Sequence, residues 1–334
     1  MSCLSGYVLV FVVMIAGVVG VSANQSADPV ANVLQGYPGN DRLGLRQALD
    51  NAGTNRTEMI KALKSAAENE HAEISFLVRN MPKRDLVSLS SEFLLENVRL
   101  ARKARSGASW GKSVSNELYL NDVLPYVSLN ERRDNWRADF YKRFAPLVAD
   151  CKTPAEAALI LNRDVYRIFH VRYHATKRRK PDQSPYESIE LGYASCTGLS
   201  ILLVDACRAV GVPARVAGTP CWTTRPGNHS WVEVWSEGEW HFVGAAESSK
   251  LNDGWFLADA AAADPAKMEH RIYASSFKKT GLYFPMVWAW DIRYVSAVDV
   301  TAFYHKFADK TKVGGSDAEQ KAMTEAEKKL HLKK

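Results

Sequence analysis

The chain has 334 residues, of which 46% are hydrophobic and 24% charged. This composition excludes an intrinsically disordered protein and provides for one large domain or two small ones. The formal net charge of +6 comes from interleaved basic and acidic residues, which argues against a nucleic acid as partner.

The first 23 residues differ from the rest of the chain. Residues 8–21 are almost entirely apolar, and the small residues Ser22 and Ala23 follow them. This pattern predicts a signal peptide over residues 1–23, with export to the exterior or to a bacterial periplasm and no membrane span after cleavage. No Lys or Arg precedes the apolar run, so an uncleaved membrane anchor is the alternative, although a span needs about 20 apolar residues.

Residues 24–165 predict a helical N-terminal region, because their apolar residues recur at helical spacing. A stretch rich in Gly and Ser at 106–115 interrupts this pattern. We expect two more helices after it, one over residues 131–148 and one that opens at Thr153-Pro154. Threonine there can cap the helix, and proline fits its first position.

Residues 166–300 predict a helix followed by strands, and residues 301–334 predict a charged C-terminal tail. Ser195 can cap a helix that begins at Cys196 and ends at Gly211. Three strand-like runs follow it, and Ser236-Glu237-Gly238-Glu239 indicates a short hairpin between the last two. These runs are residues 213–219, 229–235 and 240–246.

The predicted chemistry centres on Cys196 and His229. A cysteine reacts as thiolate, and the first turn of a helix favours that negative charge through its unpaired backbone N–H groups. The same groups can hold the oxyanion of a tetrahedral intermediate. His229 opens a strand from which its imidazole can reach the start of the helix. We therefore predict Cys196 as nucleophile and His229 as its base.

These motifs and their order resemble the transglutaminase-like superfamily, to which peptide N-glycanases also belong. The motifs are Ala-Ser-Cys196-Thr-Gly, Arg208-Ala-Val-Gly-Val-Pro-Ala-Arg-Val, His229-Ser-Trp-Val-Glu-Val and Trp240-His-Phe-Val. The resemblance covers about 60 residues, 193–255. It implies an α+β fold with a papain-like core, in which a helix packs on an antiparallel sheet, and a triad of Cys, His and an acid. Residues 166–300 are therefore expected to be the transglutaminase-like catalytic domain.

The acid is where the sequence departs from the family pattern. Members of this family usually carry Asp four residues after the Trp that opens the third strand, and Gly244 stands there. We predict that Glu247 orients the imidazole instead, with Asp253 as the alternative. Strand parity opposes Glu247, because residues 244 and 247 face opposite sides of a regular strand unless a bulge or bend intervenes.

Further residues are candidates for the surroundings of the site. Gln183 is our candidate for a side-chain donor to the oxyanion, next to the backbone N–H of Cys196. Trp222 and Trp231 are candidates for the pocket wall, with core packing as the alternative. His170 and His174 have no partners in a zinc-binding pattern, so we predict no metal and no cofactor.

Two functions remain open at this level. One is an exported cysteine enzyme that attacks a carboxamide or peptide amide of a protein or peptide substrate, with water or an amine completing the reaction. The other is an inactive family member that serves as a binding module of the cell envelope. The sequon at Asn228-His-Ser lies beside the proposed base, so an active enzyme requires this asparagine to carry no glycan.

Overall fold

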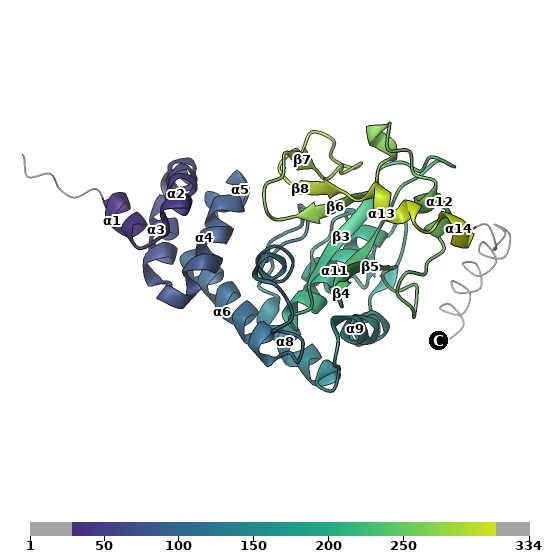
Figure 1. Cartoon of the computed structure of the whole chain (residues 1–334), viewed down its shortest axis with the longest axis horizontal. Coiled ribbons are helices and arrows are strands. Elements are labelled where there is room, and N and C mark those ends of the chain that lie inside the picture. The colour runs from purple at the N-terminus through teal and green to yellow at the C-terminus, as the bar shows by residue number, and fades with distance from the viewer. Residues whose placement is uncertain (1–28, 312–334) are drawn as a thin grey trace, which may run out of the picture.

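The computed structural model describes residues 29–311 of the chain (Figure 1). The predicted signal peptide and residues 312–334 of the predicted tail lie outside the described residues. The helices before the first strand are α1 (Pro29–Gln35), α2 (Gly39–Asn51), α3 (Arg56–Ser65), α4 (His71–Asn80), α5 (Lys83–Leu86), α6 (Ser91–Gly107), α7 (Asn116–Leu118), α8 (Arg137–Phe144) and α9 (Pro154–Ile168).

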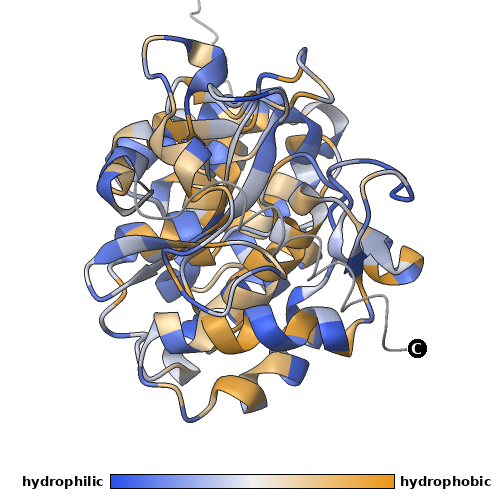
Figure 2. Cartoon of the chain, turned by 90° about the vertical axis from the view of Figure 1, so that its right-hand side faces the viewer, coloured by the Kyte–Doolittle hydropathy of each residue, from blue (hydrophilic) through white to orange (hydrophobic). Residues whose placement is uncertain are grey.

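The N-terminal helices lie at one end of the molecule and the sheet at the other, with α6 and α8 between them (Figure 1). Each helix turns an apolar face inward, and Figure 2 shows apolar residues concentrated in the middle of the fold. Helix α6 begins where the Ser90 hydroxyl accepts the N–H of Phe93, and it ends at Gly107 as the Gly/Ser-rich stretch predicts. Between residues 29 and 311, no helix combines the length and apolarity needed to cross a bilayer.

The sequence predicts two helices around residue 150, one over residues 131–148 and one that opens at Thr153-Pro154. Helix α9 begins at Pro154, where Thr153 and Glu156 form a capping box, so this prediction is confirmed. The predicted helix 131–148 is wrong at its start, because α8 begins only at Arg137. The Glu131 carboxylate accepts the N–H groups of Ser128 and Leu129 and thereby closes a non-helical turn.

An antiparallel sheet of six strands follows, in the order β5-β4-β3-β6-β8-β7. Its strands are β3 (Ala214–Thr219), β4 (His229–Ser236), β5 (Glu239–Val243), β6 (Tyr273–Ser276), β7 (Leu282–Tyr283) and β8 (Ser296–Asp299). A parallel pair, β1 (Arg172–Tyr173) and β2 (Tyr193–Ala194), precedes it. The remaining helices are α10 (Pro185–Leu191), α11 (Cys196–Ala209), α12 (Leu257–Ala261), α13 (Thr301–His305) and α14 (Ala308–Thr311).

The two faces of the sheet pack into two hydrophobic cores. Alternate residues of β3 and β4, such as Val216 and Val232, join the main core with α11 and the N-terminal helices. Their neighbours Ala217 and Trp231 face the other way, into a second, largely aromatic core. Helix α11 contacts both β3 and β4 directly. The start of this helix therefore lies against the strand that carries His229.

The predicted hairpin between β4 and β5 is present, and its turn consists of two residues. Glu237 and Gly238 both have positive φ, 52° and 97°, which suits the tight connection of two twisted strands. Strand β5, however, ends at Val243 rather than at Ala246. The prediction is wrong at this end because the chain turns sharply after Val243, with Ala246 at a φ of 65°.

Part of the segment 301–334, predicted as a charged tail, belongs to the folded body. Tyr304 of α13 is completely buried in the second core. Its hydroxyl donates to Glu233 Oε1 at 2.7 Å and accepts from Trp231 Nε1 at 2.6 Å. The C-terminal helices therefore cover the face of the sheet opposite α11.

Removing this hydroxyl tests the packing of α13. In Tyr304→Phe a buried carboxylate oxygen and a buried indole N–H lose their partner, so we expect the free energy of unfolding to fall by about 2–3 kcal/mol. Urea denaturation measures the loss. Tyr283→Phe is the control, because Tyr283 is 45% exposed and its change should be within about 0.5 kcal/mol. An equally small effect of Tyr304→Phe would contradict the packing.

Candidate active site

Cys196 is the first residue of α11, as predicted, and its surroundings fix the start of that helix. The Ser195 hydroxyl accepts the N–H of Gly198 at 3.2 Å and donates to the carbonyl of Pro181 at 2.7 Å. One residue after the cysteine, Thr197 Oγ1 lies 3.1 Å from Ser230 Oγ on β4. Helix α11 and strand β4 are thus linked at the position of the thiol.

His229 is the first residue of β4 and is 5% exposed. Its ring packs against Trp255 and Phe256, with centroid distances of 4.7 Å and 5.0 Å, and stacks on Trp231 at 5.8 Å. This aromatic packing holds the imidazole at the end of the strand. Cys196 and His229 are close enough to shift each other's pKa, and their roles as nucleophile and base stay predictions.

Glu247 reaches His229 although strand parity opposes it. The chain turns after β5, and the N–H of Glu247 donates back to the carbonyl of Gly244 at 3.2 Å. This turn brings Glu247 Oε1 to 3.6 Å from His229 Nε2, the distance of an ion pair. The other carboxylate oxygen accepts the indole N–H of Trp255 at 3.0 Å. The carboxylate therefore faces the Nε2 atom of the His229 ring.

Gly244 leaves the space that this carboxylate fills. A Cβ atom added at residue 244 would lie 2.2 Å from Glu247 Oε2 and 3.0 Å from Glu247 Cβ. A side chain at 244 and the observed position of Glu247 thus exclude each other. The acid group occupies the region that a side chain of residue 244 would enter, but it comes from three residues further along the chain.

The electrostatics favour a charged thiolate and imidazolium. Burial raises the pKa of the Cys196 thiol, but the hydrogen bond and charge of His229 and the N–H of Ser230 outweigh it, so the pKa ends below its ordinary value. Burial lowers the pKa of His229, whereas Cys196 and Glu247 raise it, with a net rise to about 9. Since the two groups titrate as a pair, these opposite shifts favour the proton on the imidazole over the proton on the sulfur.

Residues 142–260 match the family model of the transglutaminase-like superfamily. This segment is a transglutaminase-like domain. The match confirms the predicted family resemblance, and the helices and antiparallel sheet confirm the α+β class. Comparison with curated proteins and with solved structures gave no match.

The transglutaminase-like domain begins within α8 and includes all of α9, which our predicted boundary between residues 165 and 166 divides. It contains Cys196, His229 and Glu247. The superfamily is one of cysteine-dependent acyl transferases and amide hydrolases, so the match fits a cysteine-based enzyme or a module without turnover. The roles of the three residues stay predictions.

Gln183 supports the segment before the nucleophile. It is fully buried, and its amide nitrogen donates to the carbonyl of Tyr193 at 3.1 Å. Its amide oxygen accepts the N–H of Arg179 at 2.9 Å. These two bonds tie the loop before α10 to the strand that leads into Cys196. The structure thus gives Gln183 a positioning task, and the predicted donation to an oxyanion stays a prediction.

The two tryptophans predicted for the pocket wall belong to the second core of the transglutaminase-like domain. Trp231 has no exposed surface and Trp222 is 4% exposed. Their rings are stacked with 6.1 Å between centroids. A pocket wall requires exposed surface, so this prediction is corrected: both indoles support His229 from the interior. The partly exposed Trp255 is the indole that contacts both His229 and Glu247.

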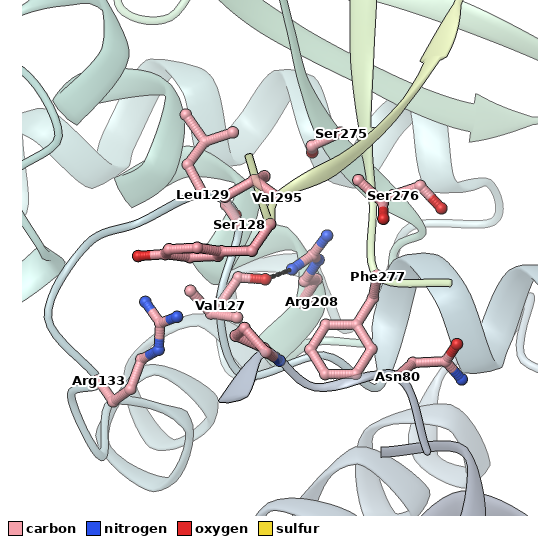
Figure 3. A pocket seen from close by; sticks show the side chains of 13 residues that line it. Asn80, Val127, Ser128, Leu129, Arg133, Arg208, Ser275, Ser276, Phe277 and Val295 are labelled. Carbon is pink, nitrogen blue, oxygen red and sulfur yellow. Dashed lines mark hydrogen bonds between the residues drawn. The ribbon is translucent and has the colours of Figure 1, made fainter. Parts of the chain in front are cut away.

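The pocket drawn in Figure 3 lies away from these residues. It sits where α4 meets β6 and β8 and is lined by Phe277, Arg133, Arg208 and several serines. None of Cys196, His229 and Glu247 contributes to it. It is therefore separate from the candidate active site of the transglutaminase-like domain.

Sequence reasoning missed three residues of the site. The backbone N–H of Ser230 helps to lower the pKa of Cys196, and Trp255 donates its indole N–H to the Glu247 carboxylate. Asn162 of α9 is hydrogen-bonded to the turn that carries Glu247. Asn162 lies more than 80 residues before that turn, so no local pattern points to it. Trp255, by contrast, stands in the aromatic stretch directly after the recognised motifs.

Proposed function

We propose that this protein is an exported cysteine-dependent enzyme that attacks a carboxamide or peptide amide of a protein or peptide substrate. Cys196 forms a thioester with the acyl part, and water or an amine then accepts the acyl group. One observation carries the proposal: the thiol at the start of α11 faces an imidazole whose pKa is raised to about 9 and which in turn faces the Glu247 carboxylate. A buried cysteine of purely structural use needs none of these partners.

The reaction follows from this arrangement. The Cys196 thiolate attacks the carbonyl carbon, and the carbonyl oxygen becomes an oxyanion near the backbone N–H groups of the first turn of α11. His229 gives its proton to the leaving nitrogen, so the C–N bond breaks and a thioester remains. The neutral imidazole then takes a proton from water or an amine, which attacks the thioester and releases the thiolate. Glu247 keeps the imidazole oriented throughout.

The pH profile of kcat/KM is the first expected result. The low pKa of Cys196 keeps the thiolate present below the ordinary thiol range, and the raised pKa of His229 keeps the general acid protonated up to about pH 9. We expect a plateau across neutral pH, with the alkaline limb near pH 9. Initial rates across the pH range measure it once a substrate is known. An alkaline limb near pH 6.5 would show that His229 is unperturbed.

A substrate-profiling screen tests the function itself. Wild type and Cys196→Ala are incubated in parallel with peptides that contain glutamine, asparagine and glycosylated asparagine, with and without an amine. Products that appear only with the wild type, together with an acyl adduct on Cys196 by mass spectrometry, support the proposal. Identical product profiles for the wild type and Cys196→Ala would contradict the proposed function.

The alternative is a binding module of the cell envelope that uses the same cleft without turnover. It predicts that peptides bind equally well to wild type and to Cys196→Ala and that none is converted. Export is part of both proposals and is supported by the apolar run at residues 8–21. Asn228 is exposed beside His229, so the enzyme proposal requires it to be free of glycan in the active form. Mass spectrometry of the purified active protein shows whether it is.

A further inference from the structure

Asn162 uses its whole carboxamide on the turn that carries Glu247. Its Nδ2 donates to the carbonyls of Gly244 at 3.1 Å and Ser248 at 2.8 Å. Its Oδ1 accepts the N–H of Ala246 at 2.9 Å. The side chain is 4% exposed on α9 and contacts both ends and the middle of the turn. Both N–H donors and the carbonyl oxygen of the amide are thereby directed at residues 244–248.

The turn does not hold this shape by local preference alone. Ala246 has a φ of 65°, a left-handed conformation that costs a residue with a Cβ atom about 1–2 kcal/mol. Such a conformation persists where its surroundings enforce it. The bond from Ala246 N–H to Asn162 falls on the strained residue itself. The residue that follows it in the chain is Glu247.

We propose that Asn162 is a positioning residue for the acid of the site. It fixes the turn over residues 244–248 so that the Glu247 carboxylate stays opposite His229 Nε2, and it acts on His229 only through Glu247. This inference deepens the proposed function and rests on it. Its consequence is specific: weakening Asn162 should lower the pKa of His229, because the imidazolium loses a well-placed carboxylate.

The test measures that pKa directly by NMR titration of the His229 ring Cε1–H, assigned by its absence in His229→Ala. Asn162→Asp keeps the size of the side chain but replaces the two donated hydrogen bonds with a carboxylate oxygen that faces two carbonyls. We expect the titration midpoint to fall from about 9 by roughly half a unit to one unit. Glu247→Gln should lower it further. The double variant should match Glu247→Gln alone, because Asn162 acts through Glu247.

Asn55→Asp is the matched control. Asn55 also donates from Nδ2 to two carbonyls, those of Leu86 and Leu89, but it lies among the N-terminal helices. This variant should leave the His229 midpoint unchanged while costing similar stability. Asn162→Ala is measured alongside, because it removes the same hydrogen bonds without a new carboxylate, whose charge would itself raise the pKa of His229. It also replaces Asn162→Asp if that variant does not fold.

The outcomes separate the inference from the proposed function. A wild-type midpoint near 6.5 would contradict the thiolate and imidazolium pair and with it the proposed function. A wild-type midpoint near 9 that stays there in Asn162→Asp would overturn only the role of Asn162. Additive shifts in the double variant would likewise show that Asn162 does not act through Glu247.

Discussion

Iodoacetamide should alkylate Cys196 at neutral pH far faster than any other cysteine of the chain, and His229→Ala should slow that reaction roughly 10- to 100-fold. The thiolate is the reacting species, and His229 is what lowers the thiol pKa against the effect of burial. Without the imidazole, the Ser230 N–H opposes the effect of burial with less help, so the pKa of the thiol should rise and the thiolate fraction should fall. Mass spectrometry of the digested protein measures the rate at each site, and no substrate is required.

The chain contains its own reference for this experiment. Cys207 lies on the same helix, is completely buried, and has a thiol pKa that burial raises far above the ordinary range. It should remain unmodified in wild type and in His229→Ala alike. Sluggish reaction of Cys196 at a rate similar to Cys221 would favour the binding module over the enzyme.

Removing the carboxylate at residue 247 should abolish turnover, and supplying a carboxylate from residue 244 instead should restore part of it. Glu247→Ala removes the orienting carboxylate, and we expect turnover to fall roughly 10²- to 10⁴-fold. Gly244→Asp alone places a side chain where Glu247 Oε2 lies, at 2.2 Å from the new Cβ, and should also lower turnover. The double variant Gly244→Asp with Glu247→Ala clears that space and supplies a carboxylate from residue 244. It should regain at least about tenfold over Glu247→Ala.

An uncharged control shows whether the restored turnover depends on the carboxylate at residue 244. Gly244→Asn with Glu247→Ala has nearly the same shape without the carboxylate and should stay as inactive as Glu247→Ala. The φ of Gly244 lies outside the left-handed range, so its backbone accepts a side chain. A double variant that folds and remains as inactive as Glu247→Ala would contradict the equivalence of the two positions. Full activity of Glu247→Ala would exclude Glu247 as the orienting group.

The predictable part of the site consists of residues whose position follows from local rules. Ser195 caps the helix that begins at Cys196, and the alternating pattern from His229 onward gives the strand beside it. Side-chain chemistry and spacing are sufficient there, because caps and strand alternation are set by residues close in sequence. The order of the motifs resembles that of the transglutaminase-like superfamily, and this resemblance predicts that the helix packs on the sheet.

The remaining features depend on contacts between distant segments. The turn that reverses the parity of Glu247 needs a left-handed alanine, and Asn162 supports it from α9. Strands β6, β7 and β8 have only two to four residues each, so their pairing partners rather than their composition define them. The burial of Tyr304 likewise depends on its contacts with Glu233 and Trp231, which lie about 70 residues earlier in the chain and which no local pattern indicates.

The sulfur and the imidazole come from opposite sides of one sheet. Cys196 belongs to α11, a helix of the main core, whereas His229 packs against aromatic rings of the second core. Residues of α12 and α13 complete this second core. We expect proteolysis near α13 to loosen the aromatic core that surrounds His229 before it affects α11, because Tyr304 of α13 packs on Trp231. The reactivity of the Cys196 thiol would then report the integrity of this second core.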